Sequence, residues 1–395
     1  MKLVVLLYSL GAGGAERITS LLLENLAKEC EITLVLLEDI SNYPLAKDVK
    51  KIILGHNKTQ ESGFKKLLKI PLLALKYHKI IQDCEVSLSL MTRPNYINIL
   101  AGLLCRISRK APKILISERS LPSLQYGYPT LASKINRFLI SLLYNKADKI
   151  SANSPKNLQD LVRNFGIKRE KTTLLLNFFD LQKITTQSAE ESEFKQKILA
   201  KKAQGRFIFI SIGRLDIGKN HRLLIDCMRE FKEVADLFII GEGALQNTLQ
   251  AQIQTLRLES CVHLLGRTPN PYAPLSVADC FVFASNHEGF PNVLVESLAL
   301  GIPIITTDCA PREILAPKGE FIDAQKHCEI CKGGVIVPLE ERDSFVFAMR
   351  FLFAQPKFFA KDSLQSQAQI FSLSTQLPNY KQWIFGCQKK IDAIN

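Results

Sequence analysis

The sequence predicts an α/β protein with two Rossmann-like, doubly wound domains that face each other across a cleft. Three observations carry this prediction. The chain has 395 residues, which is more than one compact core holds and fits two domains. Short apolar runs alternate with helical patterns in both halves, as in parallel-sheet proteins. Between the halves, from Leu181 to Gly205, the chain becomes polar.

The first half opens with a βαβ unit. Leu3–Tyr8 is apolar and strand-like, Ala15–Lys28 has helical spacing, and Glu31–Leu37 is again strand-like. Lys2 and the apolar run after it also resemble a signal peptide, but the run continues into glycines without a convincing cleavage site, which favours a buried strand. Further strands are expected at Glu85–Leu90, Lys113–Ser117 and Lys149–Asn153, and a helix at Lys134–Tyr144.

The second half repeats the alternation. Strands are expected at Phe207–Ile212, Leu237–Ile240, Val262–Leu265, Cys280–Ala284 and Pro303–Thr307, with helices from about Asn220 and at Asn292–Leu300 and Leu377–Ile394. We therefore expect a first domain at 1–180, a connection at 181–205, a second domain at 206–372, and a C-terminal helix at 373–395 that packs back on the first domain. Ligands of such sheets bind at the carboxyl ends of the strands.

The positive charge is concentrated in one half. The net charge is +13, and residues 1–187 hold 28 Lys and Arg against 15 Asp and Glu, so they account for all of the excess. This asymmetry indicates an anionic partner, such as nucleic acid, a phospholipid surface or a diphosphate. The ten cysteines have no repeating spacing and are expected to be reduced. Cys328 and Cys331 form the one close pair, and loop thiols explain it better than a metal or redox site.

A glycine-rich loop follows the first strand. Gly11, Gly13 and Gly14 lie between strand and helix, where a backbone can approach a phosphate closely. A dinucleotide fingerprint would need a third glycine where the chain has Glu16, so a sugar diphosphate is the better prediction. A glycine-rich turn used only for tight packing would give the same pattern.

Two cations follow the first strand of the second domain. Arg214 comes directly after Gly213, and Lys219 precedes the next helix. Two fixed cations with helix amides can neutralise a diphosphate without a metal ion, so no metal or other cofactor is expected. Taken alone, the pair is also compatible with solvated surface charges.

The strongest pattern is a pair of glutamates separated by seven residues, Glu288 and Glu296. Glu288 is expected in a loop, near the leaving group and the donor sugar, and Glu296 in the following helix, where it can accept hydrogen bonds from ribose hydroxyls. Gly301 should cap this helix. Separately, each glutamate is also compatible with an exposed helix face or a first-turn acid.

These motifs resemble those of the retaining glycosyltransferases of family GT4, which have the GT-B fold. The matching segments are Gly13–Arg17, Ser117–Ser120, Gly213–Asn220, Gly241–Gly243 and Glu288–Glu296. The resemblance implies a catalytic group formed by Glu288, Arg214 and Lys219. It implies donor contacts at Gly13, Gly14, Gly213, Arg214, Lys219, Gly243, Glu288, Gly289, Phe290, Asn292, Val293 and Glu296. The acceptor side would include Arg17, Arg93, Glu118 and Arg119.

A closer likeness is to the N-acetylgalactosaminyltransferases of bacterial protein N-glycosylation. The segments that carry it are Tyr8–Arg17, Arg93–Tyr96, Lys134–Asp148, Asn157–Val162 and Gly213–Asn220. It implies UDP-GalNAc as the UDP-sugar donor, an undecaprenyl-diphosphate-linked glycan (a polyprenyl-diphosphate acceptor), and an α-1,4 product. It also implies a cytoplasmic location, peripheral on the inner membrane. Two departures stand out: many relatives have His where this chain has Arg119, and Cys309–Ile314 lacks the glycine of the related segment.

The segment Gly63–Lys79 mixes lysines with leucines. Its lysines could meet the headgroups of an anionic membrane surface while its leucines dip into the lipid, or its apolar side could face the core. Pro71 interrupts it, so one long helix is not expected.

Three further functions are compatible with parts of the pattern. Binding of nucleic acid would use the basic charge, but no nucleic-acid motif is recognised, so no nucleic-acid partner is expected. An epimerase or phosphorylase of the same fold is the second. A GT4 hexosyl- or HexNAc-transferase of lipopolysaccharide or capsule synthesis is the third.

Overall fold

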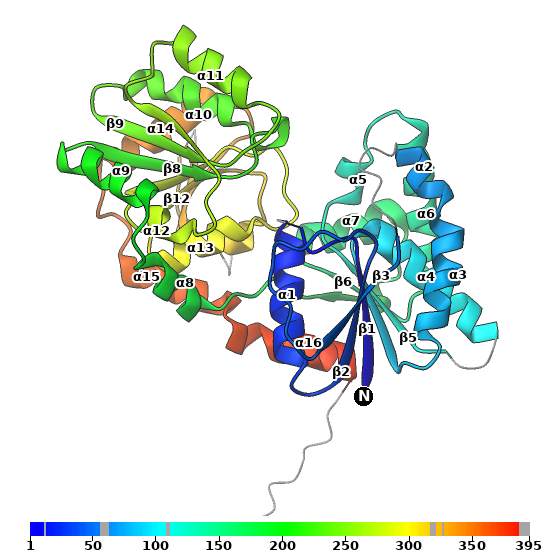
Figure 1. Cartoon of the computed structure of the whole chain (residues 1–395). Helices are drawn as coiled ribbons and strands as arrows, with labels where there is room; N and C mark the ends of the chain where they lie inside the picture. The colour runs from blue at the N-terminus through cyan, green and yellow to red at the C-terminus, as the bar shows by residue number, and fades with distance from the viewer. Residues whose placement is uncertain (12, 56–62, 108–110, 317–320, 326–327, 387–395) are drawn as a thin grey trace, which may run out of the picture. The chain divides into compact units, whose positions relative to one another are not determined.

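The computed structural model describes residues 1–11, 13–55, 63–107, 111–316, 321–325 and 328–386, and it divides into two compact units (Figure 1). The first unit is Met1–Phe179 together with the chain from Ser374, and the second is Asp180–Leu373. Each unit is an α/β layer structure built on its own sheet. The prediction of two parallel-sheet α/β domains is therefore confirmed.

The sheet of the first unit is parallel throughout its described pairs. Its strands are β1 (Lys2–Leu7), β2 (Glu31–Leu36), β3 (Val49–Ile53), β4 (Val86–Leu90), β5 (Lys113–Glu118), β6 (Lys149–Ala152) and β7 (Thr172–Leu174). Their order is β3-β2-β1-β4-β5-β6-β7. The strand order reverses between β1 and β4, and sheets of this type bind ligands at the carboxyl ends of the strands beside that point.

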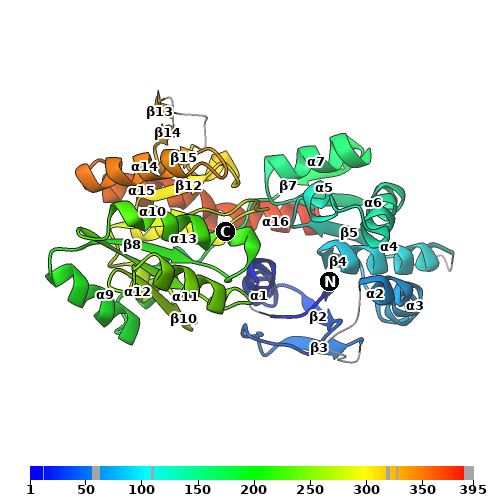
Figure 2. The ribbon, with the colours of Figure 1, turned by 90° about the horizontal axis from the view of Figure 1, so that it is seen from above.

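Helices cover both faces of this sheet. They are α1 (Gly14–Leu26), α2 (Gly63–Leu68), α3 (Ile70–Ile81), α4 (Thr92–Ile107), α5 (Pro122–Gln125), α6 (Leu131–Leu143), α7 (Pro155–Phe165) and α16 (Leu373–Phe385). The helices α3, α4 and α6 lie on one face, and α1 and α16 lie on the other (Figures 1 and 2). The strand β1 is apolar because side chains from both layers bury it.

The segment Gly63–Lys79 forms two helices rather than one. The break falls at Lys69, and Pro71 lies in the first turn of α3, where its missing N–H costs no helical hydrogen bond. Among the described residues, no helix is both long and apolar enough to cross a membrane.

The sheet of the second unit repeats the same order and adds a hairpin. Its strands are β8 (Phe207–Ile212), β9 (Ala235–Ile240), β10 (Val262–Gly266), β11 (Cys280–Phe283), β12 (Ile304–Thr307), β13 (Phe321–Gln325), β14 (Cys328–Cys331) and β15 (Gly334–Val337). The order is β10-β9-β8-β11-β12-β15-β14-β13, with antiparallel pairing only along β15-β14-β13 among the described strands. The reversal point lies between β8 and β11.

The helices of the second unit are α8 (Leu181–Ser188), α9 (Glu193–Ala203), α10 (His221–Cys227), α11 (Gln246–Thr255), α12 (Tyr272–Leu275), α13 (Asn292–Leu300), α14 (Arg342–Ala354) and α15 (Lys361–Ala368). Short 3₁₀ turns lie at Tyr144–Lys146, Arg169–Lys171, Ile217–Lys219, Met228–Glu230, Arg312–Ile314 and Gln369–Phe371. The polar segment expected to connect the domains forms α8 and α9, which pack against α12 within this unit.

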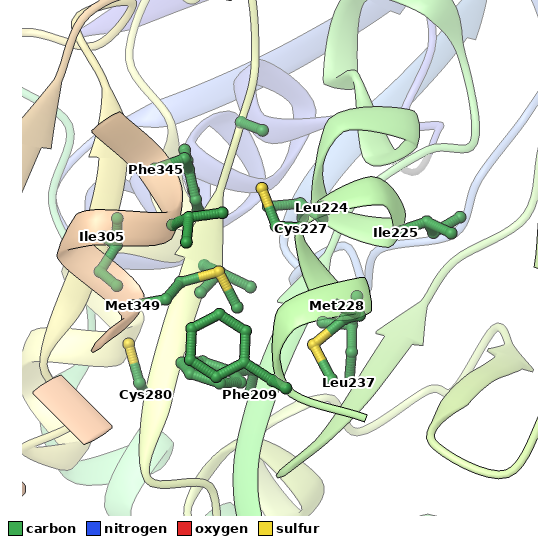
Figure 3. Packing of buried hydrophobic residues seen from close by; sticks show 14 of the residues in the cluster. Phe209, Leu224, Ile225, Cys227, Met228, Leu237, Cys280, Ile305, Phe345 and Met349 are labelled. Atoms are coloured by element: carbon green, nitrogen blue, oxygen red, sulfur yellow. The ribbon is translucent and has the colours of Figure 1, made fainter. Parts of the chain in front are cut away.

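One core cluster of the second unit lies between the sheet and the layer of α10 and α14. Phe345 and Met349 of α14 meet Leu224 of α10, and Met228 of the 3₁₀ turn after it, around Phe209 of β8 (Figure 3). All of these side chains are buried. Their packing fixes β8, and therefore the turn that follows it.

Most strands expected from the sequence are present within a residue or two. The expectations missed β3, β7 and the antiparallel strands β13, β14 and β15. Cys328 and Cys331, expected in a loop, are the two ends of β14. The strand β3, Val49–Ile53, carries two lysines and lies at the sheet edge, where only one residue is fully buried, so its apolar signal is weak. The C-terminal helix begins at Leu373, the first residue of the range 373–395 and four residues before the apolar pattern from Leu377; it ends at Phe385, and residues 387–395 lie outside the described residues.

Candidate functional site

A pocket of about 360 Å³ opens at the reversal point of the first sheet. It lies where β1 and β4 end, because Tyr8 follows β1 and Met91 follows β4. The residues that line it are Tyr8, Gly14, Ala15, Glu16, Met91, Thr92, Arg93, Pro94, Arg119, Ser120, Gln125 and Tyr126. The pocket thus combines two aromatic rings, two guanidinium groups, hydroxyls and an amide. This combination suits a polar, ring-shaped ligand.

The glycine loop forms one edge of this pocket. Gly13 is the N-cap of α1 in extended conformation and has no side-chain cap. A Cβ at Gly13 would collide with the carboxylate of Glu16, which folds back over it. Because Glu16 lies on this edge, the loop differs from a dinucleotide site, as the sequence predicts.

The cations of the acceptor-side prediction separate into two groups. Arg93 lines the pocket with its guanidinium over the ring of Tyr8, 5.7 Å from the centroid. The hydroxyl of Tyr8 donates to Glu38 at 2.5 Å and accepts a hydrogen bond from Lys66 at 2.8 Å. Arg17, in contrast, is not part of the pocket lining and lies 6.0 Å from the ring of Phe179.

Glu118 lies beneath the pocket rather than in its wall. It ends β5 and is 1% exposed. Its Oε2 accepts hydrogen bonds from the hydroxyls of Tyr144 at 2.6 Å and Thr92 at 3.1 Å. Its Oε1 accepts from the backbone N–H groups of Arg119 at 3.0 Å and Ser120 at 3.3 Å, and from the Ser120 hydroxyl at 3.0 Å. Burial raises the pKa of Glu118, although these hydrogen bonds lower it in part.

Arg119 follows Glu118 directly and lines the pocket. Its Nη1 donates to Oδ1 of Asn177 at 2.8 Å and to the hydroxyl of Tyr380 at 3.2 Å. Three of the four residues expected on the acceptor side, Arg93, Glu118 and Arg119, are therefore in or directly beneath one pocket.

The second candidate region lies at the reversal point of the second sheet. Gly213 and Arg214 follow β8, and the loop with Ser285 and Glu288 follows β11. Lys219 joins the two, because its ammonium forms an ion pair of 2.5 Å with Oε1 of Glu288 and lies 5.1 Å from the ring centroid of Phe283. The structure thus brings together two of the three residues expected to be catalytic.

The ion pair is held from both loops. The hydroxyl of Ser285 donates to the same Oε1 of Glu288 at 2.7 Å, and the side chain of Asp216 accepts from the backbone N–H of Lys219 at 3.1 Å. Burial first, and then the charge of Lys219, lowers the pKa of the neighbouring His221 to about 4. The imidazole of His221 is therefore neutral near pH 7, and the positive charge beside Glu288 is the ammonium of Lys219.

Arg214 is not part of this ion pair. Its side chain is 83% exposed, and its guanidinium lies 3.3 Å from Asp216. In the structure it is therefore a surface side chain beside the corner.

Gly241 and Gly243, which follow β9, let the end of this strand approach the turn at Gly213. Gly241 follows β9 with φ +153°, and a Cβ there would collide with the carbonyl oxygen of Gly213. A Cβ at Gly243 would collide with the backbone of Leu215. The motif Gly241–Gly243 thus keeps the turn after β8 tightly packed.

The second glutamate lies in α13, as expected. This helix begins at Asn292, one residue after Pro291, and Gly301 caps it with φ +73°. Glu296 is little more than one turn into the helix and is buried. Phe290 is also buried, with its ring 5.7 Å from that of Phe371. Gly289, Asn292 and Val293 are half-buried at the start of the helix.

Sequence reasoning missed several residues of these two regions. Tyr126 and Ser285 lie in or beside them, and no motif signals either residue. Tyr8 belongs to the matching segment Tyr8–Arg17 but is not among the predicted site residues. The role of all three depends on which strands are neighbours. Asp216 carried a usable signal, since an Asp three residues before the end of a short turn is a common cap.

Two family models match the chain. The model described as Glycosyltransferase Family 4 matches residues 12–183, and the model described as Glycosyl transferases group 1 matches residues 191–329.

Among the relatives, an enzyme of Campylobacter jejuni is 40% identical over 309 residues, which are 78% of this chain and 80% of the relative. Its name is N-acetylgalactosamine-N,N'-diacetylbacillosaminyl-diphospho-undecaprenol 4-alpha-N-acetylgalactosaminyltransferase. A second enzyme of that organism, a GalNAc-alpha-(1->4)-GalNAc-alpha-(1->3)-diNAcBac-PP-undecaprenol alpha-1,4-N-acetyl-D-galactosaminyltransferase, is 29% identical and covers 75% of this chain and 77% of its own length.

Solved structures share the fold at low sequence identity. HepE of Anabaena, solved in complex with UDP, gives a TM-score of 0.77 at 16% identity, and it covers 98% of this chain and all of its own. The sucrose-phosphate synthase of Thermosynechococcus elongatus gives 0.78 at 17% identity, with 97% and 98% covered. These likenesses support the GT-B fold.

Proposed function

Because the chain belongs to glycosyltransferase family 4 and is a glycosyltransferase, we propose that it transfers GalNAc from UDP-GalNAc, in α-1,4 linkage and with retention, to an undecaprenyl-diphosphate-linked glycan. The product would serve glycan assembly for protein N-glycosylation. The observation that carries this proposal is the corner where Lys219, Glu288 and Ser285 meet at the reversal point of the second sheet. The 40% identity to an enzyme named for this transfer supports the choice of sugar and acceptor.

The donor would bind at this corner. During transfer the bond from the anomeric carbon to the UDP oxygen breaks, and negative charge develops on the diphosphate. Lys219 is a fixed cation for that charge, because Glu288 and Asp216 hold it in place. Arg214 is exposed and can turn towards the diphosphate at the cost of one surface contact to Asp216. Together these two cations would stand in for a metal ion, so we propose that none is needed.

The glutamates would have separate tasks in donor binding. Glu296 would accept hydrogen bonds from ribose hydroxyls at the start of α13. Glu288 would orient the sugar hydroxyls and hold Lys219 with the same carboxylate. Gly213, Gly243, Gly289, Phe290, Asn292 and Val293 would shape the donor site with their backbone or rings. Gly13 and Gly14 would let the sugar diphosphate pass close to the loop before α1.

The acceptor glycan would occupy the pocket of the first unit. Tyr8 and Tyr126 offer faces on which sugar rings can stack, and Arg93 and Arg119 offer donors to sugar or phosphate oxygens. The acceptor hydroxyl would form the new bond to the anomeric carbon on the face from which UDP leaves, and its proton would pass to the departing diphosphate.

An anionic membrane surface is a further proposed partner, because the acceptor carries a lipid. On α2 and α3, the side chains of Phe64, Leu68, Leu72 and Leu75 are exposed, at helical spacing. Lys65, Lys69, Lys76 and Lys79 are exposed beside them. Apolar side chains next to lysines are typical of helices that lie in the interface of an anionic bilayer. We place the protein on the cytoplasmic face of the inner membrane, as a peripheral protein.

The experiment that tests this function offers the protein a panel of UDP-sugars with polyprenyl-diphosphate mono- and disaccharides, and reads the products by mass. We expect one HexNAc to be added from UDP-GalNAc only when the lipid-linked acceptor is present. Turnover of the UDP-sugar without acceptor would indicate an epimerase. Transfer of a different hexose would contradict the proposed donor.

A further inference from the structure

The last described helix, α16, supplies one residue to the surroundings of the acceptor-side pocket. Tyr380 of this helix is buried, and its ring meets that of Phe178 edge-on, with centroids 5.0 Å apart and planes at 77°. Its hydroxyl donates to the carbonyl oxygen of Leu175 at 3.3 Å. Contacts from two directions therefore fix both the ring and the hydroxyl, so the hydroxyl oxygen is a rigid acceptor.

The group that uses this acceptor is Arg119. Its Nη1 donates to the Tyr380 hydroxyl at 3.2 Å, and its Cζ lies 5.9 Å from the centroid of the same ring. Asn177, which is also buried, accepts from Nη1 at 2.8 Å. The guanidinium is thus bonded from one end and covered on one side by an aromatic face, a combination that restricts its rotation.

The other nitrogens of the Arg119 guanidinium carry N–H groups that these two bonds do not use. An arginine side chain carries five N–H donors, and the two bonds just described use Nη1 alone. Nε is buried and has no hydrogen-bond partner among the described residues. Because Arg119 lines the pocket, a ligand that enters it meets a cation that is already oriented.

We infer that Tyr380 is a positioning residue for acceptor binding: it holds the Arg119 guanidinium in the pocket wall so that its remaining donors serve the acceptor glycan. This inference rests on the proposed function, in which the pocket takes the acceptor. Tyr380 acts through Arg119 and touches no reacting atom.

The test is a double-mutant cycle in the full chain, with steady-state kinetics on UDP-GalNAc and an undecaprenyl-diphosphate disaccharide. Tyr380→Phe removes the acceptor oxygen and keeps the ring. We expect it to raise the KM for the acceptor by about 3- to 10-fold, while the KM for UDP-GalNAc stays unchanged. Arg119→Ala should raise the same KM at least as much. In the Arg119→Ala background, Tyr380→Phe should add nothing, because its route to the acceptor is gone.

The matched control is Trp383→Phe, one turn further along α16. Trp383 is buried like Tyr380, and its indole Nε1 has no hydrogen-bond partner among the described residues, so this change removes volume without removing a bond. Both KM values should stay as in the wild type.

The outcomes separate the inference from the proposed function. If Arg119→Ala leaves the acceptor KM unchanged, the assignment of the pocket to the acceptor fails. If Arg119→Ala raises it but Tyr380→Phe does not, only the positioning role fails. An equal effect of Tyr380→Phe with and without Arg119, or an equal rise in both KM values with a lower Tm, would show general loosening and would also overturn the positioning role.

Discussion

One carboxylate oxygen of Glu288 makes two contacts: it forms an ion pair with Lys219, and it accepts a hydrogen bond from the hydroxyl of Ser285. The ion pair is mostly but not fully buried, so water screens it less than a surface pair. A cation held in this way needs little reorganisation when charge develops on a leaving group. At the residue scale, the fixed position of Lys219 and its pairing with Glu288 therefore matter more for stabilising the leaving group than its charge alone.

Replacement of Lys219 tests this corner. We expect Lys219→Ala to lower kcat by about 100- to 1000-fold, since a preorganised charge-stabilising group is worth that much. The matched control is Lys202→Ala, which breaks the ion pair to Asp279 in the same unit and should leave kcat near the wild-type value. Near-normal turnover of both Lys219→Ala and Glu288→Ala would contradict the assignment. Steady-state assays with UDP-GalNAc measure it.

Glu118 gives a residue-scale prediction on stability. Glu118→Ala would leave the hydroxyls of Tyr144 and Thr92 and two backbone N–H groups without their acceptor in a buried site. We expect it to lower the free energy of unfolding by about 3 kcal/mol or more. Glu118→Gln keeps the volume and one oxygen and should cost less. Urea denaturation compares the two, and equal losses would show that the hydrogen bonds contribute little.

At the scale of elements, the turn after β8 depends on how closely the turn after β9 approaches it. Gly241 and Gly266 both have positive φ, but only Gly241 lies against the backbone of Gly213. Gly266 therefore tests a positive φ without a collision, and Gly241 tests a positive φ with one.

We expect Gly266→Ala to cost about 1 kcal/mol of unfolding free energy, from its left-handed backbone alone. Gly241→Ala adds the collision with the Gly213 carbonyl, so it should cost more and should also raise the KM for the donor. Urea denaturation and donor titration measure both effects. If the two variants behave alike, the close approach is not what requires Gly241.

The strand β9 carries a second element-scale prediction. Asp236, in β9, accepts from Arg206 at 2.6 Å, and its other oxygen lies 2.7 Å from a ring nitrogen of His263 in β10. Burial alone would raise the pKa of Asp236, but the hydrogen bonds from His263 and Arg206 outweigh it, so the pKa lies below its ordinary value. A carboxyl of this kind stabilises the fold above its unfolded pKa of about 3.9, and the contribution is lost as pH falls through its folded pKa.

The difference in the free energy of unfolding between wild type and Asp236→Asn should therefore shrink as the pH falls below about 4. A difference that does not change with pH would contradict this, and denaturation across that range measures it.

At the scale of the whole molecule, charge and exposed apolar groups coincide in the first unit. All of the excess positive charge lies in residues 1–187, and the exposed leucines of α2 and α3 lie in the same segment. A protein that meets its acceptor at an anionic bilayer gains affinity from both.

Liposome co-sedimentation tests this arrangement. The wild type should bind vesicles rich in phosphatidylglycerol at low salt and release them as salt is raised. We expect Leu68→Ser with Leu72→Ser to weaken binding by at least about tenfold, because each buried leucine contributes roughly 1.5–3 kcal/mol. Leu339→Ser changes an equally apolar, exposed residue of the second unit and should have no effect. Absence of wild-type binding at low salt would contradict the membrane proposal.

The sequence by itself determined the two-domain α/β architecture, because buried parallel strands are short apolar runs and helix caps are local. Gly301 and Pro71 mark helix ends through their own backbone preferences, and the structure has those ends. The spacing of Glu288 and Glu296 likewise placed one in a loop and the other in a helix.

Only the tertiary structure decided which side chains meet. The order of strands in the sheets determines these contacts. Lys219 reaches Glu288, Arg214 does not, and Glu118 lies under the pocket. Tyr380 is more than 250 residues from Arg119 in the chain, so no local pattern could connect them. Strand neighbours and the return of α16 to the first unit are long-range packing choices, and local sequence preferences do not encode them.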